Sequence, residues 1–441
     1  MHRYFPHTPA DEAHMLKAIG ADRVEDLFAS IPEGCRKPEP LHLPSMSEWE
    51  LTARAEELAA AMPAAGSAWV GAGNYQHYIP AVVPAIISRS EFCTAYTPYQ
   101  PEISQGTLQG IFEFQTLIAR LTGMEVANAS MYDGATALAE AALMACRQTR
   151  RHSVAVSMGV HPHYRQVLAT YCRAAGIDLA ELPLKADGST DVAPATAGEL
   201  AGLIVQSPNF FGVIEPLAAQ ADWIHAGKGL LIAGFTEAMS LGLVASPGSQ
   251  GADIVAGEGQ SFGLSQMYGG PNLGIMATRK AYVRSMPGRL VGQSVDTAGK
   301  RAFVLTLSTR EQHIRRERAV SNICSNAGLC AMTCAVYLAT MGGTGLAHMA
   351  RLNRDKAAYF KAGLLARGFR PLFDGPTFNE FALEAPEGFA AWRQRLLDER
   401  GVLFGLELKE VGYDLPGYLF CVTETRSRAD LDAMLEEVAH V

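Results

Sequence analysis

Short apolar runs alternate with segments of helical spacing through the middle of the chain. The apolar runs are three to six residues long. Glycine, proline or polar residues precede and follow them, as is typical of buried strands. Alanine- and leucine-rich helical patterns at 135–148 and 214–225 separate them. This alternation predicts an α/β domain whose mostly parallel sheet is covered on both faces. The expected strands are 125–127, 153–157, 203–206, 229–234, 253–256 and 273–277.

The pattern changes at both ends of the chain. Residues 1–62 favour a helical arm, in which Ser47 caps a helix and Glu50 completes a capping box. Such an arm packs either on its own domain or on a partner subunit, and the pattern does not separate the two. Near the other end, Gly342-Gly343 ends a buried helix. We therefore expect a large domain over 63–343 and a smaller C-terminal α+β domain over 344–441.

The stretch Gly251–Gly274 combines two apolar runs with a glycine-rich polar loop between them. Loops at the carboxyl ends of parallel strands are where α/β proteins bind ligands. An ordinary tight connection between strands would explain the same glycines. The stretch is thus a candidate ligand loop, and the glycines alone do not decide it.

A second candidate is the proline-stiffened segment 88–106. Pro98 and Pro101 exclude a helix through its middle. Its side chains include two phenols and several hydrogen-bonding groups, which suit the wall of a site or an interface as well as a packed loop. The side chains in question are Tyr96, Thr97, Tyr99 and Gln100.

Other candidates stand at helix starts and in a glycine-rich segment. Ser130 and the run Gly134–Thr136 precede or open a helix, where free N–H groups can hold a phosphate. His161 stands at another helix start, and His77 lies in a segment dense in aromatic residues. A plain capped helix and buried structural histidines are the alternatives.

Composition narrows the classes of function. The chain has 441 residues, 48% of them hydrophobic and 19% charged, which indicates a large core. A net charge of −8 without long Lys/Arg blocks argues against a nucleic-acid partner. No cysteine or histidine cluster has metal-site spacing, and no long apolar run predicts a membrane span. Without the apolar core of a signal peptide near residue 1, we expect a cytoplasmic protein.

The segment Tyr96–Gly106 reads YTPYQPEISQG and closely resembles the glycine decarboxylase (P-protein) family of the glycine cleavage system. The resemblance extends to 77–80, 310–317 and 321–324, and so covers nearly the whole chain. In length the chain is similar to the first subunit of the two-chain form. The resemblance implies a fold-type I pyridoxal-phosphate (PLP) transferase fold for the large domain.

The same resemblance shows two departures from a working PLP site. The position of the Schiff-base lysine is Ser261, and no lysine lies between Lys228 and Lys280. The run 230–233 leads to Gly-Phe-Thr where an aspartate would face the pyridine nitrogen, and Glu237 falls out of the strand's alternation. Without an amine, this chain lacks the means to anchor PLP. Ser130, Gly134, Thr136 and His161 then form a vestigial cofactor site, and no catalytic residue is expected on this chain.

The resemblance implies a function shared between two chains. A second subunit carries PLP covalently in an assembly of two plus two chains. Together they decarboxylate glycine, release CO₂ and pass the aminomethyl group to the lipoyl group of the H-protein. Tyr96, Thr97, Tyr99, Gln100 and His77 are the residues expected to complete the partner's active site.

Two alternatives remain at the level of sequence. The chain is either a non-catalytic scaffold or regulatory homologue of a PLP enzyme, or a self-sufficient enzyme that uses Lys280 or Lys228. The intact tyrosine-rich loop argues against the first, and the position of Lys280 after a strand argues against the second.

Overall fold

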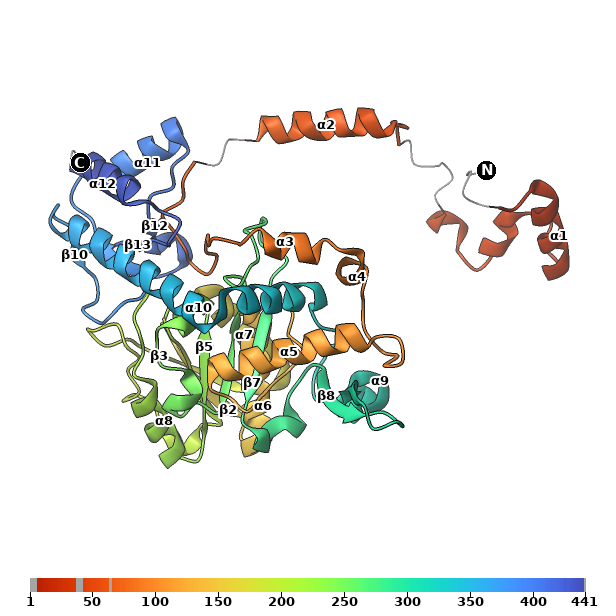
Figure 1. Ribbon diagram of the computed structural model, residues 1–441, viewed down its shortest axis with the longest axis horizontal. Helices are drawn as coiled ribbons and strands as arrows, with labels where there is room; N and C mark the ends of the chain where they lie inside the picture. Colours follow the sequence, from red (N-terminus) through yellow and green to blue (C-terminus); the bar gives the residue numbers. More distant parts are fainter. Residues whose placement is uncertain (1–5, 37–42, 63–65, 440–441) are drawn as a thin grey trace. The chain divides into compact units, whose positions relative to one another are not determined.

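The computed structural model describes residues 6–36, 43–62 and 66–439. The chain forms two units, which divide after Ala64 and are taken separately here (Figure 1). The first unit holds two α-helices, α1 (Pro9–Ile19) and α2 (Glu48–Ala61). Two 3₁₀ turns, Val24–Phe28 and Glu33–Cys35, follow α1.

The expected cap of α2 is confirmed. The backbone N–H of Ser47 donates to Glu50 Oε2 over 2.7 Å, and the N–H of Glu50 donates back to Ser47 Oγ. This reciprocal pair satisfies N–H groups that the first helical turn leaves open. None of the described residues of this unit is buried, and Trp49 is 73% exposed.

The second unit is built on a seven-stranded sheet in the order β1-β7-β6-β5-β4-β2-β3. The neighbours from β6 through β3 pair in parallel, whereas β7 is antiparallel to both β6 and β1. The α/β prediction with a mostly parallel sheet is therefore confirmed. The strands are β1 (Val126–Ala127), β2 (Ser153–Ser157), β3 (Asp178–Leu182), β4 (Gly202–Gln206), β5 (Leu230–Phe235), β6 (Ile254–Glu258) and β7 (Gly274–Thr278).

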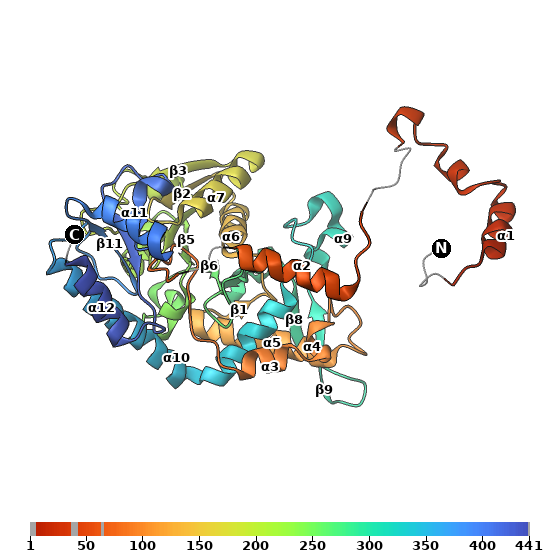
Figure 2. The same ribbon diagram turned by 90° about the horizontal axis from the view of Figure 1, so that it is seen from above.

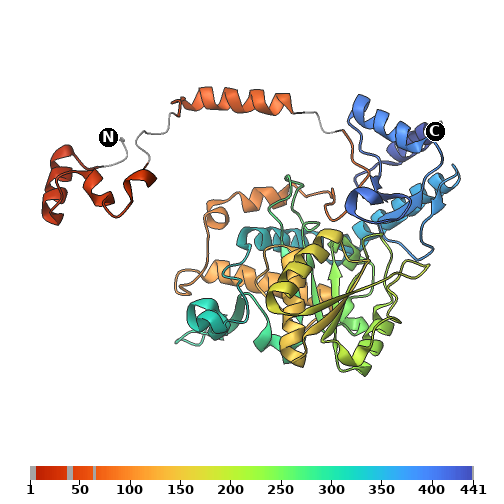
Figure 3. The ribbon, with the colours of Figure 1, turned by 180° about the vertical axis from the view of Figure 1, so that it is seen from behind.

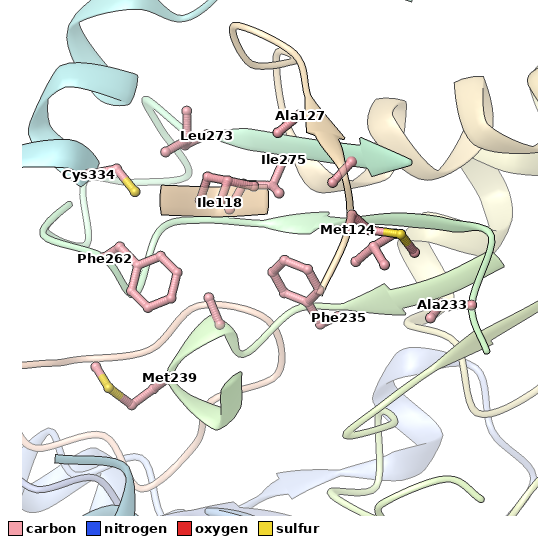
Figure 4. Close-up of a cluster of buried hydrophobic side chains, with 14 of the residues drawn as sticks. Ile118, Met124, Ala127, Ala233, Phe235, Met239, Phe262, Leu273, Ile275 and Cys334 are labelled. Atoms are coloured by element: carbon pink, nitrogen blue, oxygen red, sulfur yellow. The ribbon is translucent and has the colours of Figure 1, made fainter. Parts of the chain in front are cut away.

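Both faces of the sheet are buried, and alternate residues of each strand enter different cores. In β4, Leu203 and Val205 join the core formed with α5, α8 and α10, while Ile204 joins the core formed with α6 and α7. Figure 1 shows α5 and α10 on one side of the sheet, and Figure 3 shows the yellow helices of the other side in front of the strands. Figure 4 shows part of the first core, with Phe235 and Phe262 beneath the carboxyl edge of the sheet. Because both faces of the sheet are covered, we expect a ligand site to be formed by the loops at the strand ends.

The helices expected at 135–148 and 214–225 correspond to α6 and α8. The long helix α10 breaks at Gly342 (φ 61°, ψ 177°), where the sequence predicts the end of a buried helix. The helices are α3 (Val82–Ile87), α4 (Ser90–Cys93), α5 (Gln105–Thr122), α6 (Gly134–Thr149), α7 (Pro162–Ala175), α8 (Leu217–Ala226), α9 (Gln312–Arg315), α10 (Gly328–Leu365), α11 (Phe389–Arg400) and α12 (Arg428–Val438).

The end of the chain forms a small lobe around a second sheet, in the order β10-β11-β13-β12. Its strands are antiparallel, and α11, α12 and the second half of α10 pack on them around Phe360, Phe404 and Phe420. Within the described ranges, α10 alone is long and apolar enough to cross a membrane, and half of its most apolar window is buried in the fold. The strands are β10 (Arg370–Pro371), β11 (Glu380–Glu384), β12 (Leu406–Glu407) and β13 (Tyr418–Cys421).

Some strands of this unit were not predicted from the sequence. The antiparallel hairpin of β8 (Leu290–Val295) and β9 (Arg301–Thr306) is not among the expected strands. This hairpin packs on α5, as Figure 2 shows from above. The edge strand β3 was not predicted, because three of its five residues are exposed and its apolar run is short. The hairpin matters for the site, because Arg289 stands directly before it.

Candidate functional site

The tyrosine-rich segment forms a loop between α4 and α5, and both of its tyrosines are exposed. Tyr96 is 83% exposed and Tyr99 is 58% exposed, whereas Pro98 between them is buried. Thr97 is half-buried and Gln100 is exposed. The buried proline fixes the backbone, so the two phenols are presented with little conformational freedom left to lose on docking.

Arg289 anchors this loop from inside the protein. Its Nη1 donates to Thr97 Oγ1 and to Ser325 Oγ, each over 3.1 Å, and its Nη2 donates to the Tyr99 hydroxyl over 2.5 Å. The guanidinium carbon also lies 4.8 Å from the centre of the Tyr99 ring. Arg289 is 3% exposed, and Glu311 lies 3.7 Å from its Nε. One buried cation thus joins the loop to the hairpin and to the segment that precedes α10.

A second tie comes from the first residue of α5. The Gln105 side chain donates to the carbonyl of Phe303 in β9 and accepts from the N–H of Phe303, each over 2.9 Å. It also donates to the carbonyl of Pro101. Together with Arg289, this amide ties both ends of the loop to the hairpin.

A separate cluster lies at the carboxyl ends of β5 and β6. Ser261, which is 1% exposed, donates its hydroxyl to Glu237 Oε1 over 2.8 Å. The other oxygen of Glu237 accepts from Asn379 over 2.8 Å and faces His77 Nε2 at 3.0 Å. His77 Nδ1 in turn faces Glu424 Oε2 at 2.8 Å. These side chains form one buried hydrogen-bond network at the strand ends.

His77 is the cation of this network. Burial favours the neutral ring, but the negative charge of Glu237 and the hydrogen bonds to Glu237 and Glu424 outweigh it and raise the pKa of His77 to about 10. For Glu424, burial is likewise outweighed by the hydrogen bond and charge of His77, so its pKa is lowered. The imidazolium ring, with 2% of its side chain exposed, therefore separates two carboxylates inside the protein.

The residues of the expected vestigial site are also engaged within the chain. Ser130 has a left-handed backbone (φ 101°), and its hydroxyl accepts from the N–H of Ala327. The N–H of Gly134 donates to Glu258 Oε2 over 3.0 Å. The N–H of Thr136 donates to Asp133, which caps α6.

His161 is engaged in the same way, as the residue that caps α7. Its Nε2 lies 3.0 Å from the carbonyl of Ala72, and its Nδ1 accepts from the N–H of His163. Burial lowers the pKa of His161 to about 4, so the ring is neutral at physiological pH. Its edge contacts with Phe210 complete its packing, which leaves the ring committed to its own chain.

Comparison with known proteins decides the family. Residues 2–438 match the family model described as glycine cleavage system P-protein. The chain belongs to the glycine cleavage system P-protein family. A P-protein relative from Desulfotalea psychrophila, named probable glycine dehydrogenase (decarboxylating) subunit 1, is 52% identical and is matched over 99% of this chain and 98% of its own length. A relative of the same name from Moorella thermoacetica is 51% identical, with 98% of each chain covered.

Solved structures agree with this family and with its fold. A crystal structure of glycine decarboxylase (P-protein) of the glycine cleavage system, in inhibitor-bound form, superposes with a TM-score of 0.90 at 45% identity and covers all of both chains. A NifS-like protein superposes with a TM-score of 0.60 at 12% identity, over 85% of this chain and 98% of its own. At that identity the likeness concerns the fold alone, which is the fold-type I architecture of PLP-dependent enzymes. The fold class and the family expected from the sequence are confirmed.

The structure of this chain separates the predicted site residues into two groups. Tyr96, Thr97, Tyr99 and Gln100 lie together on the anchored loop, whereas His77 lies in the buried cluster with Ser261 and Glu237. The role of His77 at a partner's cleft stays a prediction. Arg289 was not singled out from the sequence, where it is one arginine before a short apolar run. Glu237 was set aside because of its place in the alternation of β5, but that strand ends at Phe235, so the alternation does not extend to it.

The residues of this chain do not fit PLP as an anchored cofactor. The group at the lysine position is a hydroxyl that is bonded to Glu237, and the N–H at the start of α6 is bonded to Glu258. Both groups are thus already bonded within the chain. Among the described residues, no three His, Cys, Asp or Glu side chains gather as a metal site would require.

Proposed function

We propose that this chain is the subunit of a two-chain glycine decarboxylase that does not anchor PLP and that completes the active site of the PLP-bearing partner. The observation that carries the proposal is the contrast between its two regions. At the carboxyl ends of β5 and β6 the buried polar side chains bond to one another, while the loop bearing Tyr96 and Tyr99 is anchored by Arg289 and left exposed. A chain that served only itself would have no use for an anchored loop that leaves Tyr96 and Tyr99 exposed.

The contribution of this chain is positioning and electrostatics. The buried Arg289 fixes the hydroxyls of Thr97 and Tyr99, so these groups need no reorganisation when the partner's site closes over them. The two phenol rings also exclude water from the surface that they cover. PLP on the partner subunit supplies the electron sink for decarboxylation. No proton or covalent step is assigned to this chain.

The remaining assignments follow from the same proposal. Two copies of this chain assemble with two copies of the PLP-bearing subunit in the cytoplasm. Glycine is the substrate, and the lipoylated H-protein receives the aminomethyl group. The likeness to the glycine dehydrogenase relatives and to the inhibitor-bound P-protein supports these assignments.

A self-sufficient enzyme would need a lysine near the sheet's carboxyl edge. Lys280 follows β7, which runs antiparallel to β6, and the end of β7 pairs with Ile254 at the start of β6. Lys228 stands two residues before β5 begins. Both lysines therefore lie at the opposite ends of the strands from Ser261. Their position supports the proposal that neither lysine carries the cofactor.

The scaffold alternative is tested by the two phenols. The double variant Tyr96→Phe with Tyr99→Phe keeps both rings but removes both hydroxyls, including the one that accepts from Arg289. We expect the glycine–bicarbonate exchange rate of the reconstituted enzyme to fall by about tenfold or more, because fixed hydroxyls are lost from the completed site. The measurement is exchange of labelled bicarbonate into glycine with the partner subunit and the H-protein present.

The matched control is Tyr359→Phe, which removes a phenol hydroxyl bonded to Asp432 in the C-terminal lobe. It is expected to leave the exchange rate close to that of the unmodified chain. An unchanged rate in the double variant, with normal assembly, would favour the scaffold alternative.

A further inference from the structure

A cleft of about 520 Å³ lies between α6 and α7 on one side and residues 312–322 on the other. The tyrosine-rich loop and the polar cluster at the strand ends contribute no residue to its lining. Leu143, Ala174 and Ala175 form an apolar wall, and Ala319 faces the same cleft from the other side. The cleft therefore has the size and the apolar surface that suit a small organic molecule.

One carboxyl group in the lining of this cleft has an oxygen without a hydrogen-bond donor. Glu140, two turns into α6, is 1% exposed, and no described residue donates to its Oε2. Burial raises the pKa of Glu140, against a hydrogen bond from Ser321 and the charge of Arg147. A buried carboxyl oxygen that lacks a donor costs free energy, which a donor placed in the cleft would recover.

The cation of the same helix does not supply that donor. Arg147 lies two turns beyond Glu140, and its Nη2 donates to the carbonyl of Ser285 over 3.1 Å instead of to Glu140 Oε2. An ammonium group in the cleft would bring both a positive charge and N–H donors to the carboxylate, and such charge-assisted hydrogen bonds are the strong ones. The chemistry of the cleft thus fits a cation that is carried on an apolar body.

The wall opposite α6 continues into the segment that Arg289 holds. Ser321 and Asn322 line the cleft, and Ser325, three residues after Asn322, accepts from Arg289 Nη1 over 3.1 Å. Asn322 also makes a hydrogen bond with Tyr171 of α7. A ligand in the cleft would therefore contact a segment that is continuous with the anchor of the tyrosine-rich loop.

We propose that this cleft binds a small organic amine, with its ammonium group on Glu140 and its apolar body against Leu143 and Ala174. The ligand class is a primary alkylammonium ion. All the residues that would hold it belong to this chain, so the site does not depend on the glycine decarboxylase function proposed for the assembled enzyme.

The test is a calorimetric titration of the isolated full-length chain with isoamylamine at pH 7. Isoamyl alcohol, which has the same apolar body without the charge, is the matched ligand. We expect the amine to bind about tenfold more tightly than the alcohol or better, because a charged hydrogen bond to a buried carboxylate adds to the same apolar contacts. The amine should also raise the Tm of the chain at matched ionic strength.

Two variants of the cleft locate the binding. Glu140→Gln keeps the size of the side chain but removes its negative charge, and it is expected to weaken amine binding about tenfold or more while leaving alcohol binding nearly unchanged. Glu317→Gln removes a charge from the same cleft, at a side chain that is 77% exposed. This control should change either affinity by less than about twofold, because exposed charges contribute little.

Equal affinity for amine and alcohol, or no binding of either, would overturn the proposal, and the unmodified chain gives that result even if Glu140→Gln does not fold. An equal loss of amine binding in Glu140→Gln and Glu317→Gln would indicate adventitious attraction to surface charge only. Binding to the isolated chain that is absent from the assembled enzyme would show that the partner subunit covers the cleft, which also contradicts a free amine as the ligand.

The titrations of the isolated chain need neither PLP nor exchange activity. Their failure is therefore distinguishable from a failure of the proposed glycine decarboxylase function.

Discussion

Replacing Arg289 with alanine is expected to lower the exchange rate of the reconstituted enzyme by about a hundredfold. The guanidinium makes three hydrogen bonds and a ring contact, and two of the groups that it holds, Thr97 and Tyr99, belong to the exposed loop. Without the guanidinium, the loop loses its internal anchor. The exchange rate should then fall, because small displacements of groups that position a substrate have large effects on the rate. Assay of labelled bicarbonate exchange over a range of glycine concentrations separates an effect on kcat from one on KM.

Two further variants test whether the fall in rate is caused by the loss of the contacts between Arg289 and the loop. Arg301→Ala removes an exposed arginine that contacts Phe303 on the same hairpin, and it is expected to leave the rate nearly unchanged. Arg289→Lys keeps the charge but loses the planar fork, so it should recover only a part of the rate. A rate for Arg289→Ala within twofold of the unmodified enzyme, with assembly intact, would show that the loop needs no anchor.

Replacing His77 with glutamine is expected to destabilise the isolated chain by about 3–5 kcal/mol, since it leaves buried charge without its partner. The imidazolium lies between Glu237 and Glu424, and the side chains of all three are at least 96% buried. Glutamine keeps hydrogen-bonding groups but brings no positive charge. Equilibrium unfolding in denaturant at pH 7 measures the difference, and His348→Gln, at an exposed position of α10, is the control that should cost little.

The unmodified chain and His77→Gln also allow a test by pH, because the direction in which their stability difference changes with pH is predicted. The folded-state pKa of His77 is raised from 6.5 to about 10, so its contribution to stability is fully present below pH 6.5 and is lost as the pH rises toward 10. The stability difference between the unmodified chain and His77→Gln should therefore shrink between pH 7 and pH 10. A difference that is constant or grows over that range would contradict the assignment of an imidazolium at this position.

Much of the fold follows from short-range pattern. The runs that became β2, β4, β5 and β6 were recognisable because these strands are buried on both faces and so are almost continuously apolar. The exposed edge strand β3 and the hairpin of β8 and β9 gave no such signal. In the hairpin only the first two residues of β8 and Phe303 of β9 are buried, so most of its sequence has the polar character of a loop.

The candidate site was predictable only where its chemistry lies within one segment. The loop from Tyr96 to Gln100 was recognised from a continuous sequence motif. The absence of a lysine was recognised from the residue at a single position, Ser261. The contacts of Arg289 with Thr97 and of Glu258 with Gly134 join residues 192 and 124 positions apart. No local pattern encodes such pairs, because tertiary packing brings them together. Glu237 was missed for a different reason, namely that a strand's alternation was extended beyond the strand's end.

The most direct test of the central claim is spectroscopic and covalent. PLP is added to this chain alone, to the partner subunit and to the mixture, and each sample is reduced with borohydride and examined for PLP fixed to lysine. The account predicts no fixed PLP on this chain in any sample, with fixation on the partner and glycine–bicarbonate exchange in the mixture. A borohydride-stable label at one lysine of this chain, together with exchange activity by this chain alone, would contradict it.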